Sequence, residues 1–319
     1  MVVIAEEKAV DYALTARLAT EAFADEGVKF SPERIRWLYE RSFGQGTRVL
    51  AALEDGQKVG QIALIGQNIR IAGEAHPAVQ LVDLFVMPTH RSAGLVRKLY
   101  REVERICEAR GIRYVLALPN DKSVRLNARL LKLAPLALLP IRAGVSLLRS
   151  SAKLACSGRL KSMEREAAVA LLAPFACPAN ENGVHYDGKS LFSRLDDPTR
   201  DYAAHATDEL LLISTERKHK NVSHTLLCGF FAREGARLGA HSVDDLVGAA
   251  CSFWRAPLFV YAGINDSLPK LPGWPLPAWL KRPIVVQLRD RAADLAAGSA
   301  TDPAQTQFAR FQLIDSDFA

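Results

Sequence analysis

A short glycine-containing turn ahead of a helix is the clearest sign of chemistry in this sequence. The residues from Arg91 to Gly94 follow an apolar run and precede apolar residues at helical spacing. The first turn of a helix exposes unpaired backbone N–H groups at the positive end of the helix dipole, which makes it a suitable site for a pyrophosphate. Gly94 lets the backbone approach such a ligand, and Arg91 offers a positive charge to a phosphate. An ordinary loop arginine and a tight turn also fit these residues, because the pattern is common by chance.

A carboxylate within the preceding apolar run is the second candidate. Residues 82–86 predict a strand in which Asp83 and Phe85 lie on one face and their three apolar neighbours on the other. A buried carboxylate is costly unless it is paired or has a function. As a general base, Asp83 needs a pKa that desolvation has raised toward neutrality. As a structural residue, it bonds to a loop amide or to a nearby arginine, and the sequence leaves both interpretations open.

Cysteines and histidines give no support for metal or disulfide chemistry. The five scattered cysteines form no CxxC pair, and their odd number favours buried free thiols in a reducing cytoplasm. His219 and His224 are the closest histidines, and a spacing of five does not align them on one helix face. We therefore expect no metal ion and a cytoplasmic location. The cysteines are Cys107, Cys156, Cys177, Cys228 and Cys251.

Length and composition fit a globular protein of two domains. The chain has 319 residues, 49% hydrophobic and 24% charged, and roughly 100–200 residues per domain imply two domains. The net charge of +6 suits an anionic ligand but falls short of the dense basic stripe of a nucleic-acid-binding protein. The N-terminus lacks the pattern of a secretory signal. The nine uncharged residues 133–141 are too few for a membrane span, which takes about 20.

Local signals place both candidates in one run of elements. Ser31 and Pro32 start a helix as N-cap and first helical residue, and the turn around Gly56 joins two β-rich runs as a hairpin. The turn at Arg91 connects a strand to a helix that leads into the next strand. The expected elements are helices from Asp11 to Ala24 and from Ser31 through Tyr39, strands at 48–53, 58–65 and 80–87, a helix from Leu95 to Cys107 that stops at Gly111, and a strand at 113–118.

The stretch from Val82 to Val96 resembles the central motif of the GNAT superfamily of acyl-CoA N-acyltransferases. That motif is an apolar strand and V-x-P, followed by R/Q-x-x-G-x-G/A at the start of a helix. Val96 replaces the last small residue, as in a branch of the superfamily whose loop reads R-x-x-G-L-F or G-L-V. The same branch has counterparts of residues 30–39 and of the P-N-x-x-S signature at 119–123. The three matches together cover roughly residues 10–150.

The resemblance implies an α/β (α+β) domain of the acyl-CoA N-acyltransferase fold over residues 1–150, with a mixed central sheet flanked by helices. It also implies acetyl-CoA or a longer acyl-CoA as co-substrate, with the pyrophosphate on the turn and the pantetheine between diverging strands at 83–86 and 115–118. Members often carry an acidic base on the first of these strands, which makes Asp83 the candidate general base. The residues implied at the acyl-CoA are Leu84, Phe85, Val86, Arg91, Ser92, Ala93, Gly94, Leu95, Val96, Asn120 and Ser123.

The second half reads as a degenerate copy of the first. Strands at 209–214 and 225–232, a helix capped by Ser242, and strands at 258–262, 284–288 and 311–314 repeat the earlier order. No R/Q-x-x-G-x-G/A turn precedes this helix, so residues 151–319 are expected to be a GNAT-like domain without the CoA turn. An unrelated α+β domain is the alternative.

Two apolar segments have more than one interpretation. Residues 268–280 carry four prolines with Trp274 and Trp279, and we expect a surface loop, with a lid or an acceptor-binding strip as alternatives. For residues 130–141 we expect a buried strand and connection, with an acyl-chain cradle or a membrane contact as alternatives.

The function that these residues favour is transfer of an acyl group from CoA to a small-molecule or peptide amine by direct attack. The protein would hold the thioester carbonyl on strand amides while a base takes a proton from the acceptor. A non-catalytic acyl-CoA-binding sensor or scaffold is the alternative. It is supported by the absence of a tyrosine from residues 120–139, where many superfamily members place a general acid.

Overall fold

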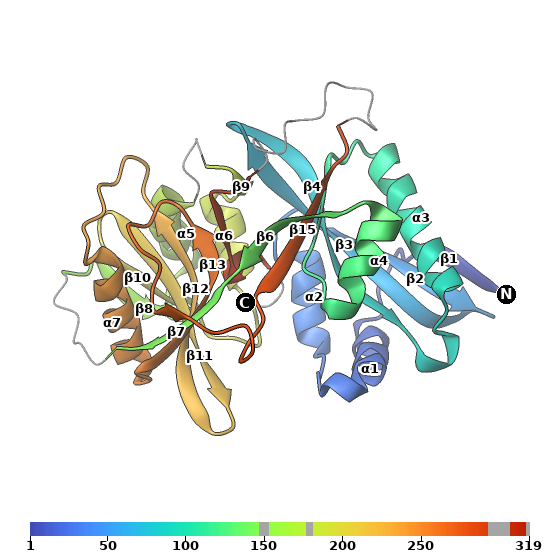
Figure 1. Ribbon diagram of the computed structural model, residues 1–319, viewed down its shortest axis with the longest axis horizontal. Helices are drawn as coiled ribbons and strands as arrows, with labels where there is room; N and C mark the ends of the chain where they lie inside the picture. Colours follow the sequence, from blue (N-terminus) through green and yellow to red (C-terminus); the bar gives the residue numbers. More distant parts are fainter. Residues whose placement is uncertain (147–152, 177–180, 293–306, 317–319) are drawn as a thin grey trace. The chain divides into compact units, whose positions relative to one another are not determined.

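The computed structural model describes residues 1–146, 153–176, 181–292 and 307–316. The chain forms two compact units, and each takes up more than one stretch of the sequence (Figure 1). Unit 1 consists of residues 1–69, 76–136 and 285–303, and unit 2 of residues 70–75, 137–284 and 304–319. Each unit contains a mixed sheet with helices packed against it, which confirms the predicted fold class.

Strands β4 and β5 of unit 1 form a parallel pair within a larger sheet. The strands lie in the order β1-β2-β3-β4-β5-β15. Neighbours pair antiparallel at β1/β2, β2/β3 and β5/β15, whereas β4 and β5 are parallel. A parallel pair needs a crossover, and helix α3 supplies it. The strands are β1 (Val2–Glu6), β2 (Thr47–Glu54), β3 (Gln57–Ile71), β4 (Glu74–Val86), β5 (Tyr114–Ala117) and β15 (Ile284–Asp290).

Side-chain caps start the helices of unit 1. Asp11, Ser31, Ser92 and Asn120 each accept a hydrogen bond from the backbone N–H three residues further along. Such caps satisfy N–H groups that have no partner within the helix. The helices are α1 (Tyr12–Ala22), α2 (Pro32–Glu40), α3 (Ala93–Ala109) and α4 (Asp121–Leu131), with short 3-10 helices η1 (Ala24–Glu26) and η2 (Pro88–His90).

Helices cover both faces of this sheet at the end of β4. Leu99 and Val103 of α3 pack into a core that also takes up Val86 of β4. Leu18 of α1 packs instead against Phe85, the neighbour of Val86, on the opposite face. The end of β4 is therefore fixed between α3 and α1, and the turn that follows it starts from a rigid base.

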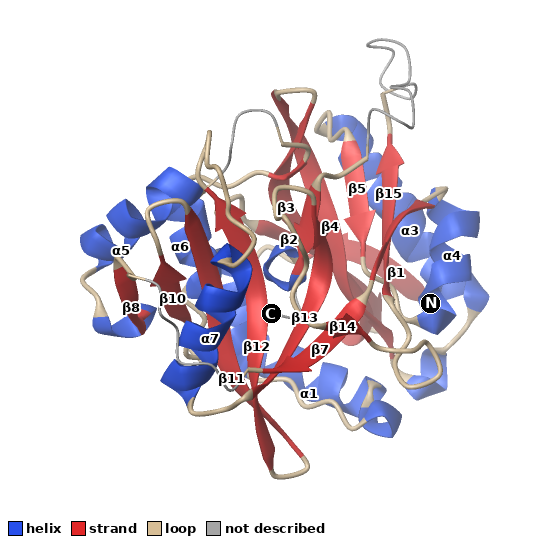
Figure 2. Cartoon of the chain, turned by 60° about the vertical axis from the view of Figure 1, so that its left-hand side comes forward, coloured by secondary structure: helices blue, strands red, loops and turns tan. Residues whose placement is uncertain are grey.

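Unit 2 contains a second mixed sheet, in the order β8-β10-β11-β12-β13. Strands β12 and β13 are parallel and are joined by α7, which lies against the sheet (Figure 2). Two further strands, β7 and β16, pair antiparallel with β13. The helices are α5 (Arg165–Leu172), α6 (Gly188–Leu195) and α7 (Ser242–Trp254). The strands are β7 (Ile141–Val145), β8 (Cys156–Arg159), β9 (Gly183–Val184), β10 (Ala203–Ala206), β11 (Leu210–His219), β12 (Val222–Ala232), β13 (Leu258–Asn265), β14 (Trp274–Pro275) and β16 (Arg310–Gln312).

The two units repeat one order of elements. Unit 1 runs β1, α1, α2, β2, β3, β4, α3, β5, and unit 2 runs β8, α5, α6, β10, β11, β12, α7, β13 with only the short β9 added. The pairings also correspond, including the parallel pair at the end of each run. The second half thus repeats the element order of the first, and its assignment as a GNAT-like domain without the CoA turn stays a prediction.

Two strands depart from the predicted layout. β15 follows the strands of unit 2 in sequence but pairs with β5 of unit 1, while β7 follows the helices of unit 1 and pairs with β13 of unit 2. The expected domain boundary at residue 150 lies outside the described residues, and unit 2 already takes up the chain from residue 137. The expected strand at 311–314 is β16 followed by a 3-10 helix, η6 (Leu313–Asp315).

The segment 130–141 is also different from the expectation. It contains the end of α4 and then strand β6 (Ala134–Leu139), along which the chain passes from unit 1 to unit 2. We expected this strand to be buried, but most of it is exposed or half-buried, and Leu138 is 59% exposed. Helices α4, α5 and α6 and strands β1, β7, β8, β9, β10 and β14 were not predicted.

Candidate functional site

The ladder between β4 and β5 of unit 1 ends before β4 does, although residues 115–117, which we expected to diverge from β4, still belong to it. Their ladder pairs Ala78 with Tyr114 and ends with Leu81 opposite Ala117. Strand β5 stops there, whereas β4 continues for five more residues to Val86. The backbone edge of β4 beyond Leu81 is therefore not part of that ladder, and it offers N–H and C=O groups to an extended ligand.

An irregularity in β4 marks the point of separation. Asp83 has a φ of 50°, a left-handed conformation that is rare for a residue other than glycine within a strand. Leu81 and Leu84, three residues apart, both pack on the core beneath α3, so the alternation of faces is broken between them. This is the signature of one extra residue in the strand, a β-bulge. It turns the segment from Leu84 to Val86 relative to the paired part of β4.

Asp83 is held by a buried tyrosine. The hydroxyl of Tyr39, on α2, donates to a carboxylate oxygen of Asp83 at 2.6 Å and accepts from the side-chain amide of Gln61, on β3, at 2.9 Å. Tyr39 is 3% exposed, and burial together with the Asp83 charge raises the pKa of its phenol well above the ordinary value. The phenol therefore stays protonated and keeps its proton available to the carboxylate.

The predicted environment of Asp83 is only partly correct. Asp83 and Phe85 share the face toward the N-terminal helices, as expected, since Asp83 meets α2 and Phe85 meets α1. Asp83 is half-buried, however, so the desolvation on which its role as a base was argued is incomplete. Its carboxylate bonds to a tyrosine side chain, a partner that sequence reasoning did not name.

A buried lysine lies in the electrostatic surroundings of the same carboxylate. The ammonium of Lys58, on β3, donates to Glu7 at 2.8 Å and to the hydroxyl of Thr15 at 3.0 Å. Its pKa is lowered chiefly by burial, while the negative charges of Glu7, Asp11 and Asp83 oppose that shift. A buried lysine on β3 thus interacts electrostatically with the candidate base.

The turn after β4 leaves room at its glycine. Ser92 caps α3 by accepting from the N–H of Leu95 at 3.3 Å. A Cβ added at Gly94 would meet only the Ser92 hydroxyl, at 3.9 Å. The packing of the protein itself therefore does not require glycine at this position, whereas a ligand on the first-turn N–H groups would. This observation fits a pyrophosphate at the start of a 17-residue helix.

The side chain of Arg91 forms hydrogen bonds within the protein. Its guanidinium donates to the carbonyl of Ala22 at 2.7 Å and to the carbonyl of Val86 at 3.3 Å. Ala22 ends α1 and Val86 ends β4, so the side chain ties both elements to the turn. The structure thus gives Arg91 a supporting position, and its expected contact with a phosphate stays a prediction.

Most of the remaining predicted residues have side chains packed in the core, so they can contact a ligand chiefly through their backbone groups. Phe85, Val86 and Leu95 have buried side chains, and Leu84 and Val96 pack on the core beneath α3. Val96 thus contributes to the helix–sheet core, which accounts for a large residue at that position. Residues 91–96 are all brought together at the start of α3.

Asn120 and Ser123 form the N-terminal cap of α4. The side chain of Asn120 accepts from the backbone N–H of Ser123 at 3.0 Å. Further along α4, Asn127 is buried, accepts from the hydroxyl of Tyr100 on α3 at 2.5 Å and donates to Gln287 of β15 at 3.1 Å. The P-N-x-x-S signature therefore starts a helix that is fixed to α3 and β15. Whether Asn120 and Ser123 also contact acyl-CoA stays a prediction.

In unit 2, β16 contacts the part of β12 that extends beyond the β12/β13 ladder. The β12/β13 ladder ends with Leu227 opposite Tyr261, as the ladder of unit 1 ends before β4 does. Gln312 of β16 bonds both backbone groups of Phe230 in β12, accepting at 2.8 Å and donating at 3.0 Å, while β16 pairs with β13. A Cβ at Gly229 would lie 2.9 Å from Ile314, so glycine permits this close approach.

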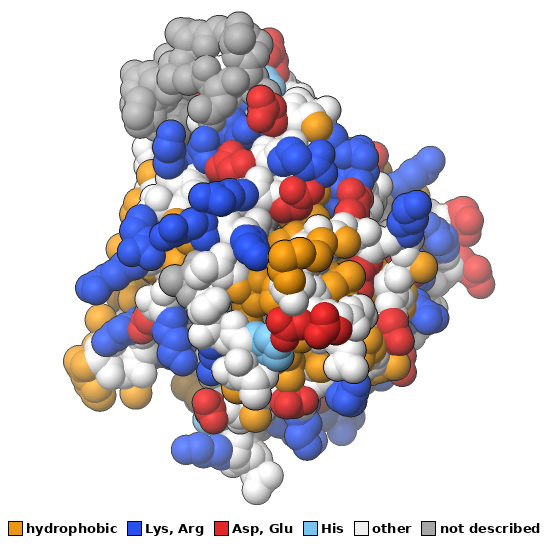
Figure 3. All heavy atoms as spheres, turned by 90° about the vertical axis from the view of Figure 1, so that its right-hand side faces the viewer, with side chains coloured by type: hydrophobic (Ala, Val, Ile, Leu, Met, Phe, Trp, Pro, Cys, Tyr) orange, Lys and Arg blue, Asp and Glu red, His pale blue; other side chains and the backbone are white. Residues whose placement is uncertain are grey.

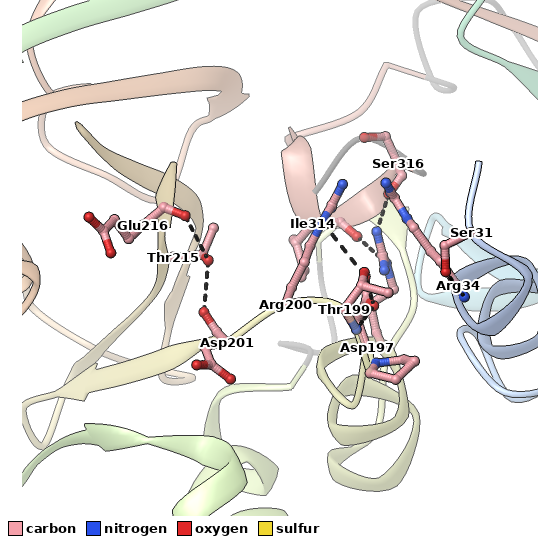
Figure 4. Close-up of polar contacts among 12 residues, drawn as sticks. Ser31, Arg34, Asp197, Thr199, Arg200, Asp201, Thr215, Glu216, Ile314 and Ser316 are labelled. Atoms are coloured by element: carbon pink, nitrogen blue, oxygen red, sulfur yellow. Dashed lines mark hydrogen bonds and ion pairs between the residues drawn. The ribbon is translucent and has the colours of Figure 1, made fainter. Parts of the chain in front are cut away.

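A buried arginine holds the chain that follows β16. The guanidinium of Arg194, on α6, donates to the backbone carbonyls of Ile314 and Ser316. Burial raises the pKa of the neighbouring Asp315 to about 6. Close by in unit 2, the carboxylate of Asp197 accepts from both the N–H and the hydroxyl of Thr199 (Figure 4). No R/Q-x-x-G-x-G/A pattern precedes α7, and the expectation that unit 2 binds no CoA stays a prediction.

The described residues offer no metal site, and the visible charges are mixed. Among residues that the structure describes, no group of three or more His, Cys, Asp or Glu could hold a metal ion. Cys107, Cys156, Cys228 and Cys251 are free, and Cys177 lies outside the described residues. On the face in Figure 3, described Lys and Arg side chains are interspersed with Asp and Glu. None of the described helices is long and apolar enough to span a membrane.

Comparison with known families gives a match to part of the first unit. The acetyltransferase (GNAT) domain family matches residues 5–125, which include β4, the turn and α3. No curated protein matches the sequence of this chain. The matched residues contain every predicted site residue, from Asp83 to Ser123.

Solved structures share the fold across most of the chain. A probable N-acyltransferase from Enterococcus faecalis is 12% identical with a TM-score of 0.62, covering 91% of this chain and 73% of that protein. A GCN5-related N-acetyltransferase from Kribbella flavida is 12% identical with a TM-score of 0.61, covering 98% and 81%. Saccharomyces cerevisiae N-myristoyltransferase with bound myristoyl-CoA is 13% identical with a TM-score of 0.60, covering 90% and 79%.

Proposed function

Because residues 5–125 carry a GNAT acetyltransferase domain, we propose that this protein transfers the acyl group of an acyl-CoA to an amine by direct attack. The observation that carries the proposal is the joint position of the open edge of β4 and the turn at Gly94. The strand edge ends at Val86, and α3 begins seven residues later. An extended pantetheine chain and its pyrophosphate need these two features in succession.

Three parts of unit 1 support binding of acyl-CoA. The first-turn N–H groups of α3 and the helix dipole attract the pyrophosphate. The space at Gly94 admits it, and Arg91 supports the turn from behind through Ala22 and Val86. The β4 edge beyond Leu81, which lies outside the β4/β5 ladder, is the proposed site of the pantetheine, and its N–H groups are the proposed donors to the thioester carbonyl.

Asp83 is the proposed general base. An acceptor arrives as an ammonium ion and must lose a proton before its nitrogen can attack the thioester carbonyl carbon. The C–N bond then forms, the C–S bond breaks, and the CoA thiolate leaves and takes up a proton. Asp83 lies where β4 leaves β5, and Tyr39 fixes the orientation of its carboxylate. Acetyl-CoA and longer acyl-CoA esters, with a small-molecule or peptide amine, are the proposed substrates.

A non-catalytic acyl-CoA sensor is the second candidate, because residues 120–139 contain no tyrosine to protonate the departing thiolate. Turnover separates the two. We would measure thiol release from acetyl-, octanoyl- and palmitoyl-CoA with a panel of primary amines, and CoA affinity by calorimetry. Amine-dependent thiol release supports the enzyme. Tight CoA binding without release for any amine favours the sensor, and no CoA binding contradicts both.

A further inference from the structure

Two tryptophans of unit 2 lie almost fully in solvent. Trp274 is 74% exposed and Trp279 is 84% exposed, whereas Trp37 and Trp254 are buried. Large aromatic side chains usually bury most of their area, so two exposed ones in one segment need an explanation. The segment from Leu268 to Leu280 is a loop, as the sequence predicts, apart from the short strand β14, but its two tryptophans are not packed against the loop.

The loop that carries these tryptophans is held to the sheet. Trp274 and Pro275 form β14, which pairs with Ala143 and Arg142 of β7. The Arg142 guanidinium donates to the carbonyls of Pro272 at 2.9 Å and Gly273 at 2.6 Å. Beyond β14, the N–H of Leu280 bonds to the Pro277 carbonyl at 2.9 Å, closing a turn around Trp279. The two exposed indole rings are therefore carried by a backbone that is itself hydrogen-bonded to the rest of unit 2.

Trp274 belongs to a larger apolar face. Opposite residues of antiparallel strands share a face of the sheet, and so do residues two apart on one strand. Trp274 is opposite Ala143, Val145 is two residues further along β7, and Leu258 of β13 is opposite Val145. Val145 is 52% exposed and Leu258 is 41% exposed. The sheet β14-β7-β13 thus presents apolar side chains to solvent on one face.

The segments that build this face lack acidic residues. No Asp or Glu occurs between Asp121 and Glu164, or between Asp266 and Asp290. Lys281 and Arg282 are exposed and lie two and three residues after Trp279 along the chain. The surroundings of the apolar face therefore favour a negatively charged partner.

We propose that the face formed by Trp274, Val145 and Leu258, together with the exposed Trp279 five residues after Trp274, docks unit 2 onto an anionic lipid bilayer, with Lys281 and Arg282 at the headgroups. Tryptophan rings prefer the boundary between headgroups and hydrocarbon, and basic residues beside them are attracted to anionic lipid. A surface held by β-strands inserts side chains only, so its backbone groups remain paired in the sheet. The docking does not depend on acyl transfer.

The test uses vesicles of phosphatidylcholine alone and with about 30% phosphatidylserine. Sedimentation measures the bound fraction, and tryptophan fluorescence reports the environment of the exposed rings, since the other two tryptophans are buried. We expect binding to the anionic vesicles with a blue shift of the emission. Replacing both Trp274 and Trp279 by Ala should weaken binding by at least about tenfold. Replacing Lys281 and Arg282 by Ala should weaken it by roughly fivefold per charge.

Control variants lie elsewhere in the same unit. Val222 is 51% exposed at the hairpin of β11 and β12, and Lys218 is exposed on the same hairpin. Val222→Ala and Lys218→Ala should leave vesicle binding unchanged, and thermal melting confirms that each variant folds. The proposal is overturned by absent binding, by equal binding to uncharged vesicles, or by binding that survives both sets of changes. A dimer in solution that the two Trp changes abolish would assign the face to a second copy of the chain instead.

Discussion

The hydroxyl of Tyr39 lies 2.6 Å from a carboxylate oxygen of Asp83, joining the second helix of the chain to the point where β4 leaves its parallel partner. Gln61 donates to the same hydroxyl, so the phenol can give its single proton only to Asp83. The pair fixes one carboxylate oxygen of a residue whose backbone is itself in a rare conformation. This arrangement suits a group that must keep one orientation during a reaction.

Asp83→Asn tests the role of this carboxylate. Loss of a general base should lower turnover by roughly 10²–10⁴ with acyl-CoA affinity unchanged. Tyr39→Phe should lower turnover by a smaller factor. It should also move the acid limb of the pH–rate profile to higher pH, because the charged carboxylate of Asp83 loses a hydrogen-bond donor. Steady-state kinetics and calorimetry on both variants measure these effects. Unchanged turnover in a folded Asp83→Asn protein would remove Asp83 from the mechanism.

Gly94→Asp tests the turn. A side chain and a negative charge at the first turn of α3 should abolish binding of acyl-CoA, while the melting temperature changes little because a Cβ there meets nothing closer than 3.9 Å. Gly239→Asp is the matched control, since Gly239 precedes α7, the corresponding helix of unit 2. Calorimetry should give one CoA per chain for the wild type and for Gly239→Asp. Wild-type affinity in Gly94→Asp would place the pyrophosphate elsewhere.

Arg91→Ala separates support from direct contact. The guanidinium donates to two backbone carbonyls, so its removal should lower the free energy of unfolding by about 1–3 kcal/mol. Arg97→Ala, on the exposed side of α3, should change it by less than about 0.5 kcal/mol. Urea denaturation measures both. If Arg91→Ala keeps full stability but loses acyl-CoA affinity, Arg91 contacts the ligand directly.

Features set by neighbouring residues could be predicted from the sequence. The hairpin at Asp55 and Gly56 is a two-residue turn with φ of 50° and 78°, because both residues tolerate the left-handed region. The caps at Ser31 and Ser92 and the glycine turn are likewise local. Each of these depends on chemistry within a few positions of the chain.

Contacts between distant segments could not be predicted in this way. Tyr39 and Asp83 are 44 positions apart, and neither lies in a pattern that specifies the other. The pairing of β15 with β5 depends on which free strand edge is available in the folded chain. The role of Gln312 shows the same limit: a glutamine in a short strand carries no sequence signal that it will bond the backbone of Phe230.

Asp315 should give unit 2 a distinctive pH dependence. Its pKa is raised from 3.8 to about 6 by burial, so between these values the folded protein binds more protons than the unfolded chain. Stability from this group is therefore complete below pH 3.8 and is lost as the pH rises through about 6, by about 3 kcal/mol in all. Other carboxylates act in the opposite direction, so the difference between wild type and Asp315→Asn is the quantity to measure. Asn keeps an oxygen for the N–H of Gln312, which the carboxylate now accepts at 2.7 Å. Urea denaturation from pH 4 to 7 should show the variant gaining stability relative to wild type as the pH rises, and a constant difference would contradict a buried, titrating Asp315.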